Sequence, residues 1–291
     1  MKALCIGSAM VDIIAIVEND DVERMTMHNE RASFLLLEQG RKIDSQSITT
    51  HIGGGAVNAS VSMARQGVDT SVIIKVGNDS NGSMIIDRLA VENIDDGNVI
   101  HTDELPTGTS VMVSSHDRNA TIFTQRGTNT LLRPSEIQGD IFSKCDLVYI
   151  ASLSNRSADC FPTIIDAAKQ AGAFVAVNPG IRQLLSQKNK FAQYIEKIDL
   201  LAINTVEAEA LVPVVLALED VLEDQPGHQV DEDAPRLMRY GLSAGNFNLS
   251  LPEFTNRMLS RGMGKVVITD GTKGSYLADS NGIYHCPSLR I

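Results

Sequence analysis

Apolar runs rich in β-branched residues alternate with helix-like segments from residue 70 onward. The pattern predicts strands over residues 70–76, 146–151, 174–178, 200–204, 265–270 and 275–279, and helices around 84–91 and 159–170. The strands contain few polar positions, which is typical of a parallel sheet that helices cover on both faces. We therefore predict an α/β three-layer sandwich with a mostly parallel central sheet.

Two regions depart from this alternation. Residues 13–52 have mixed polarity, with Gly40 among them, and residues 107–124 contain a run in which polar and apolar positions alternate. A period of two indicates strands with one buried face. We expect short strands within both regions to form a small second sheet, with an exposed hairpin as the alternative.

The segment 213–256 differs in composition from the rest of the chain. It contains the acidic groups Glu219-Asp220, Glu223-Asp224 and Asp231-Glu232-Asp233, together with Pro226, Pro235 and Pro252. The segment looks like an acidic insertion. A cap or partner surface is one interpretation, and a solvated helical insertion, which we favour, is the other.

Composition narrows the class of protein. The chain has 291 residues, of which 43% are hydrophobic, so it can bury a large core as a single domain over 1–291. The net charge of −11 argues against a general nucleic-acid binder. No apolar run reaches the length of a membrane span, and the four cysteines lack metal-site spacing. We expect a cytoplasmic protein with reduced, buried thiols.

Three consecutive glycines form the most distinctive motif. Gly53, Gly54 and Gly55 precede a predicted helix over 56–65, and Asn58 lies in its first turn. Glycine lets the backbone approach a ligand, and the first N–H groups of a helix have no partner within it. The motif suits a neutral, hydroxyl-rich ligand. A tight loop in which the glycines serve only a bend is the alternative.

Polar residues follow several predicted strands. Asp12 comes just after the first strand and a glycine, and Asn204 and Thr269 stand at the ends of later strands. Ligands of such sheets bind beyond the carboxyl ends of the strands. Asp12 can accept hydrogen bonds from two vicinal hydroxyls, although a turn or cap aspartate is the alternative.

Asn204 and Glu207 share one face of a helix start. Their oxygens suit a hydrated Mg²⁺ and nucleotide phosphates, but a capping box gives the same spacing. Gly271 and Gly274 follow Thr269 and give backbone access to a nucleotide, or serve only a turn. Arg126 could approach substrate or phosphate, or form a surface salt bridge.

The ordered set of motifs resembles the ribokinase (PfkB-type) carbohydrate kinase family across nearly the whole chain. The segments that carry the resemblance are 5–12, 53–60, 76–82, 126–129, 178–182, 204–207 and 267–274. The resemblance implies a ribokinase-like fold with a small β lid, which covers the sugar and often provides a homodimer contact. It also implies ATP and Mg²⁺.

Site residues follow from the resemblance position by position. Asp12, the glycine run and Asn58, with Arg126 near them, would bind the acceptor. Asn204 and Glu207 would organise the phosphates and, through water, Mg²⁺. Thr269, Gly271 and Gly274 would line the ATP site.

One family motif is missing. The Gly-Ala-Gly-Asp motif that carries the family's catalytic base does not occur, so no catalytic residue is identifiable and we expect the C-terminus to be incomplete. The expected function is ATP-dependent phosphorylation of a hydroxyl on a sugar or sugar-like molecule. A nucleoside kinase of the same family and a non-catalytic sugar- or nucleotide-binding protein are the alternatives.

Overall fold

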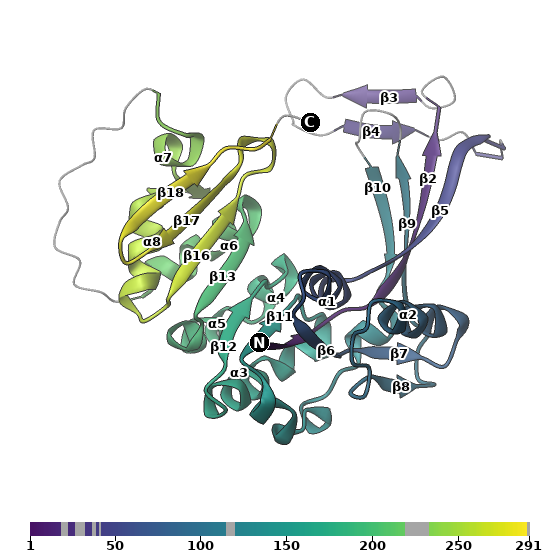
Figure 1. Cartoon of the computed structure of the whole chain (residues 1–291). Coiled ribbons are helices and arrows are strands. Elements are labelled where there is room, and N and C mark those ends of the chain that lie inside the picture. Colours follow the sequence, from purple (N-terminus) through teal and green to yellow (C-terminus); the bar gives the residue numbers. More distant parts are fainter. Residues whose placement is uncertain are drawn as a thin grey trace.

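The computed structural model describes residues 1–18, 23–26, 33–36, 39–40, 42–114, 120–218 and 233–289. An eight-stranded sheet of order β18-β17-β16-β13-β12-β11-β1-β6 forms the body of the protein (Figure 1). Its strands are β1 (Lys2–Ile6), β6 (Asp69–Ile73), β11 (Leu147–Ile150), β12 (Phe174–Val177), β13 (Leu200–Asn204), β16 (Lys265–Thr269), β17 (Ser275–Asp279) and β18 (Gly282–Cys286). All neighbours from β6 to β16 pair in parallel, whereas β17 pairs antiparallel with both β16 and β18. The predicted α/β sheet is confirmed.

One predicted strand is split in two. The apolar run 70–76 does not continue through Ile74, because β7 (Lys75–Gly77) leaves the main sheet and pairs with β8 (Ile100–Thr102). Ile74 is fully buried, so its hydrophobicity gives no sign of the break. The prediction of one continuous strand here is wrong.

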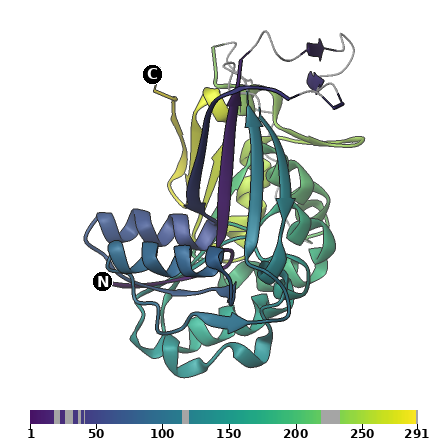
Figure 2. The ribbon, with the colours of Figure 1, turned by 90° about the vertical axis from the view of Figure 1, so that its right-hand side faces the viewer.

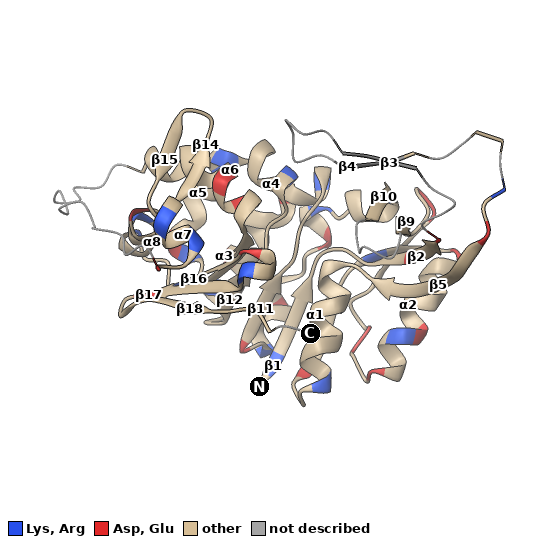
Figure 3. Cartoon of the chain, turned by 90° about the horizontal axis from the view of Figure 1, so that it is seen from above, with Lys and Arg blue, Asp and Glu red and all other residues tan. Residues whose placement is uncertain are grey.

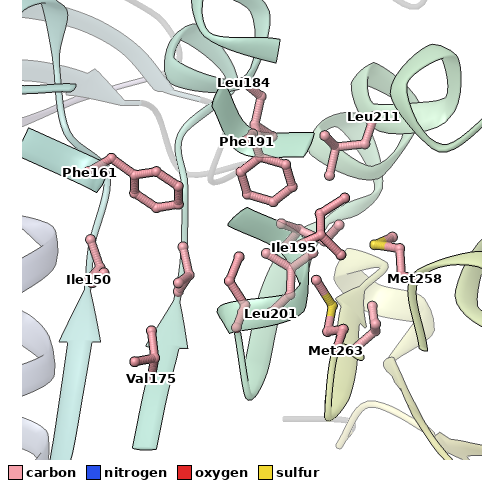
Figure 4. Packing of buried hydrophobic residues seen from close by; sticks show 14 of the residues in the cluster. Ile150, Phe161, Val175, Leu184, Phe191, Ile195, Leu201, Leu211, Met258 and Met263 are labelled. Atoms are coloured by element: carbon pink, nitrogen blue, oxygen red, sulfur yellow. The ribbon is translucent and has the colours of Figure 1, made fainter. Parts of the chain in front are cut away.

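Helices pack on both faces of the sheet. One face is covered mainly by α3 (Phe161–Gln170), α4 (Ile181–Ser186), α5 (Lys188–Tyr194), α6 (Thr205–Leu216) and α8 (Leu251–Ser260). Their aliphatic and aromatic side chains interdigitate with strand residues such as Ile150, Val175 and Leu201 (Figure 4). The other face, beside β1 and β6, carries α1 (Gly55–Arg65) and α2 (Ser80–Val91). The third layer is therefore built over this end of the sheet.

Short 3₁₀ turns connect several elements. They span Gly127–Thr130, Pro134–Glu136, Gly139–Lys144, Asn155–Cys160, Ile195–Lys197 and Gly271–Lys273. The turn at Asn155–Cys160 replaces the first part of the helix predicted from residue 159, and α3 starts at Phe161 with a proline in its first turn. Proline suits that position because its missing N–H would have no helical partner.

A separate four-stranded sheet of order β10-β9-β2-β5 extends from the body, and we call it the lid (Figures 1 and 2). Its strands are β2 (Met10–Val17), β5 (Ser45–Gly53), β9 (Gly108–Ser114) and β10 (Ala120–Gln125), while β3 (Glu23–Thr26) and β4 (Ser33–Leu36) pair with each other. The small second sheet is confirmed, although β2 begins three residues before position 13. Met10 pairs with both Gly53 and Gly108, so β2, β5 and β9 meet the body at one end.

The segment 213–256 is partly described. Residues 219–232, which hold most of its acidic side chains, lie outside the described residues. The rest comprises the end of α6, α7 (Arg236–Tyr240), the hairpin β14 (Leu242–Ala244) and β15 (Phe247–Leu249), and part of α8. Leu237, Leu242 and Leu249 are buried in the main core. These three leucines are therefore not solvated, although most residues between them are exposed, and residues 242–249 form a hairpin rather than the expected helix. That the segment is an insertion stays a prediction.

The cysteines are free, but they are not all buried. Cys5 and Cys160 lie in the core, where burial raises the pKa of each thiol to about 12, whereas Cys286 is exposed. The expectation of buried thiols is thus confirmed for Cys5 and Cys160 and wrong for Cys286, while Cys145 is only partly buried. Among the described helices, none combines the length and apolar character that a bilayer crossing requires.

Candidate active site

Asp12, Gly53 and Asn58 meet at the base of the lid. Asp12 lies inside β2 rather than in a turn, and its Oδ1 accepts a 2.5 Å hydrogen bond from Ser110 Oγ in β9. A Cβ atom on Gly53 would collide with Asp12 Oδ2 and would come within 3.9 Å of Asn58 Nδ2. The fold therefore places the predicted carboxylate and amide around a backbone position that leaves room for both.

The other two glycines are required by packing. A Cβ on Gly54, whose φ is +97°, would lie 2.5 Å from Ser8 O, and a Cβ on Gly55 would lie 2.8 Å from the Ala151 methyl group. We expected free N–H groups in the first helical turn, and here that expectation is wrong. Gly55 N donates to Ser8 Oγ and Ala56 N donates to Ser8 O, at 2.9 and 3.1 Å.

Arg126 follows β10 directly and is half-buried. Its Nη1 donates to Ser154 Oγ at 3.2 Å. Within the described part of the chain, no carboxylate forms an ion pair with it, so the surface salt bridge is not found there. Burial lowers the pKa of Arg126, and the nearby positive charge of Arg182 lowers it further.

Asn129 and Ser110 support the site but were not among the predicted site residues. Asn129 Oδ1 accepts from Ala9 N and its Nδ2 donates to Ala9 O, both at 2.8 Å. These bonds fix the link between β1 and β2, three residues before Asp12. Because Asn129 belongs to the motif 126–129, the sequence could have identified it. No local pattern could have identified Ser110, because its contact with Asp12 joins distant parts of the sequence.

Asn204 and Thr269 lie side by side at the ends of β13 and β16, where they are paired in register. Asn204 Oδ1 accepts from Glu207 N, and Glu207 Oε2 accepts from Asn204 N, each at 2.9 Å. The capping box is therefore confirmed. It occupies Glu207 Oε2, and burial raises the pKa of Glu207 although the Asn204 N–H opposes this shift.

The two glycines in the loop after β16 differ in the space around them. Gly271 has φ +54°, and a Cβ there would meet no atom within 4 Å, whereas a Cβ on Gly274 would overlap the Cys286 carbonyl. Gly271 thus leaves open backbone, and Gly274 is needed for packing against the end of β18. Asp270, which sequence reasoning passed over, accepts from Arg236 Nη1 at 2.6 Å and from Thr205 Oγ1 at 3.1 Å.

The order of strands in the sheet separates the group around Asp12 from the group around Asn204 and Thr269. Asp12 follows β1, whereas Asn204 and Thr269 end β13 and β16, with the ends of β11 and β12 between them. Among the described residues, no three His, Cys, Asp or Glu side chains cluster closely enough to hold a metal. A hydrated Mg²⁺ needs only one or two carboxylates. Glu207 suits that indirect mode, since the capping box uses only its Oε2.

The chain is similar in sequence to proteins of a known family. A family model described as pfkB family carbohydrate kinase matches residues 1–229. A ribokinase of Staphylococcus aureus (strain COL) is 25% identical over 295 residues, which cover 100% of this chain and 79% of that protein.

Solved structures share the fold. The ribokinase of Thermotoga maritima has a TM-score of 0.67 at 18% sequence identity, and the match covers 100% of this chain and 78% of that chain. A fructokinase with bound ATP from Xylella fastidiosa has a TM-score of 0.66 at 14% sequence identity, and the match covers 98% of this chain and 77% of that chain. Because the family model matches most of its length, this chain belongs to the pfkB family of carbohydrate kinases.

Proposed function

We propose that the protein phosphorylates a hydroxyl group of a sugar or sugar-like molecule with ATP and Mg²⁺. The observation that carries the proposal is the meeting of Asp12, Gly53 and Asn58 at the base of the lid. Asn204 and Thr269 end neighbouring strands of the same sheet. A carboxylate and an amide can together accept from and donate to adjacent hydroxyls.

Each residue has a role that its contacts support. Asp12, held by Ser110, would accept hydrogen bonds from the acceptor, and Asn58 would bind a neighbouring hydroxyl. Asn204 and Glu207 would orient the hydrated Mg²⁺ and the phosphates, while the open backbone at Gly271 would face the nucleotide. ATP supplies the phosphoryl group, and positioning and charge neutralisation dominate such in-line transfers. We assign no catalytic base.

The lid also suggests a partner. Ile48, Val111 and Phe123 lie on one face of it, and they are 67%, 37% and 59% exposed. We propose that this face contacts a second copy of the chain. Light scattering should then give the mass of a dimer, and Phe123→Asp should give that of a monomer. A monomeric wild-type protein would contradict this proposal.

The activity is tested with a panel of pentoses, hexoses and nucleosides. We expect one acceptor to stimulate ADP release and to yield a product heavier by one phosphoryl group in mass spectrometry. Long incubations at high protein concentration make slow turnover visible. A panel in which only nucleosides react would identify a nucleoside kinase. Tight acceptor binding without any product would indicate a binding protein.

Glu207→Gln separates magnesium binding from helix capping. Glutamine also completes a capping box, so we expect the helix to remain capped while the charge near Mg²⁺ is lost. Nucleotide binding should then need more Mg²⁺, as a magnesium titration with a fluorescent ATP analogue would show. Unchanged Mg²⁺ dependence would contradict the metal role, and Glu207→Ala, which removes the cap as well, is the control.

The same variant has a predicted pH signature. The pKa of Glu207 is raised in the folded state, mainly by burial. The folded protein therefore binds this proton more tightly than the unfolded chain, and stability falls as pH rises past the ordinary glutamate pKa. Glu207→Gln removes this loss. At neutral pH it should melt at or slightly above the wild-type temperature.

A further inference from the structure

The loop after β11 connects Arg126 with the start of α4. Ser154 Oγ accepts from Arg126, and Leu153 N donates to Gln183 Oε1 of α4 at 3.1 Å. A Cβ on Gly180, the residue before α4, would overlap Ser152 Oγ. Because Arg182 lies in the first turn of α4, this loop brings Arg126 and Arg182 to one place.

Among the described residues, neither arginine has an acidic partner. No ion pair of the described residues includes either of them. Arg126 is also partly desolvated, which disfavours its charged form. The nearby positive charge of Arg182 disfavours that form further. Buried or half-buried cations are normally paired.

Several other arginines of this acidic chain have acidic partners, although the exposed Arg156 and Arg239 are in no ion pair of the described residues. Arg65 pairs with Glu92, Arg133 with Glu104, and Arg236 with Asp270. The chain carries 36 acidic residues against 25 basic ones, and Figure 3 shows basic segments of the ribbon beside α4. Two neighbouring unpaired guanidinium groups form a favourable place for an anion, since each can bind a carboxylate or phosphate in bidentate fashion.

We infer that Arg126 and Arg182 bind an anionic group of the acceptor, so the acceptor is a sugar acid or sugar phosphate rather than a neutral sugar. The inference rests on the proposed function. Arg126 follows Gln125, which pairs with Thr109 next to the Ser110 that holds Asp12. This places Arg126 on the acceptor side, and not beside the strand ends of Asn204 and Thr269.

The terminal phosphate of the nucleotide is also an anion that the two arginines could bind. The experiment must therefore distinguish an anionic acceptor from the nucleotide. Calorimetry would compare matched probes without nucleotide: glucose with gluconate, fructose with fructose 6-phosphate, and ribose with ribose 5-phosphate. A separate titration would use a non-hydrolysable ATP analogue with Mg²⁺. We expect the charged member of at least one pair to bind about tenfold or more tightly, as a charge-assisted hydrogen bond provides.

Arg182→Met is the principal variant, because Arg182 is exposed and its replacement should not disturb folding. It should reduce affinity for the charged probe about 10- to 100-fold and leave the neutral probe and the ATP analogue unchanged. Arg182→Lys should restore part of the loss. Arg133→Met, which removes an arginine paired with Glu104, is the matched control and should change none of the affinities.

The outcomes are distinct. Equal or tighter binding of the neutral members, or loss of the ATP analogue in Arg182→Met, would overturn the inference while leaving the proposed function in place. Failure of every neutral and charged probe to bind would overturn the proposed function as well.

Discussion

Replacing Asp12 with asparagine is expected to weaken acceptor binding by about 1.5–3 kcal/mol, the contribution of a charge-assisted hydrogen bond. Asparagine has nearly the same shape and can still accept from Ser110 Oγ, which lies 2.5 Å from Asp12 Oδ1. The lid should therefore keep its geometry. Only the negative charge that would bind acceptor hydroxyls is removed, and ATP affinity should not change.

Calorimetric titration with the tightest acceptor and with an ATP analogue measures both affinities. Ser110→Ala is the matched control, because it frees Asp12 from its partner but leaves the charge, and its effect should be smaller. Equal losses of acceptor and nucleotide affinity in Asp12→Asn would show that Asp12 supports the fold rather than the acceptor.

Gly54→Ala is expected to be among the most destabilising single substitutions in the chain. An added Cβ would lie 2.5 Å from Ser8 O and 2.7 Å from Ala9 Cα, both backbone atoms that cannot swing away. The φ of +97° adds strain for any residue with a side chain. Strain and overpacking each cost about 1–3 kcal/mol, and the displaced Ser8 would also loosen the start of α1.

Gly67→Ala supplies the comparison. Gly67 also has a positive φ, +82°, but a Cβ there would meet no atom within 4 Å. Urea unfolding should therefore show a clearly smaller loss of stability for Gly67→Ala than for Gly54→Ala. Similar losses would mean that backbone conformation, and not contact with Ser8 and Ala9, explains glycine at position 54.

The strands and their ends could be predicted because both depend on local sequence. Apolar β-branched runs identify buried parallel strands, and polar residues that follow them, such as Asn204 and Thr269, must lie at the carboxyl edge. The i, i+3 spacing of Asn204 and Glu207 likewise defines a helix start. These features need no knowledge of contacts between distant segments.

Features that depend on tertiary contacts could not be predicted. Ser110 contacts Asp12 across 98 residues, and nothing local distinguishes it from other serines in alternating strands. The break at Ile74 arises because β7 has a different partner, β8, although the run remains apolar. The buried leucines of 237–249 were obscured by the acidic residues nearby, since charge indicates exposure only for the residues that carry it.

The central claim is that acceptor and nucleotide bind to separate groups of residues, one around Asp12 and one around Asn204 and Glu207. Parallel calorimetry of the wild type, Asp12→Asn and Glu207→Gln tests it most directly, with an acceptor and Mg²⁺–ATP analogue as titrants. We predict that Asp12→Asn loses acceptor affinity alone and that Glu207→Gln loses Mg²⁺-dependent nucleotide affinity alone. Loss of both affinities in either well-folded variant, or of neither in both, would contradict the account.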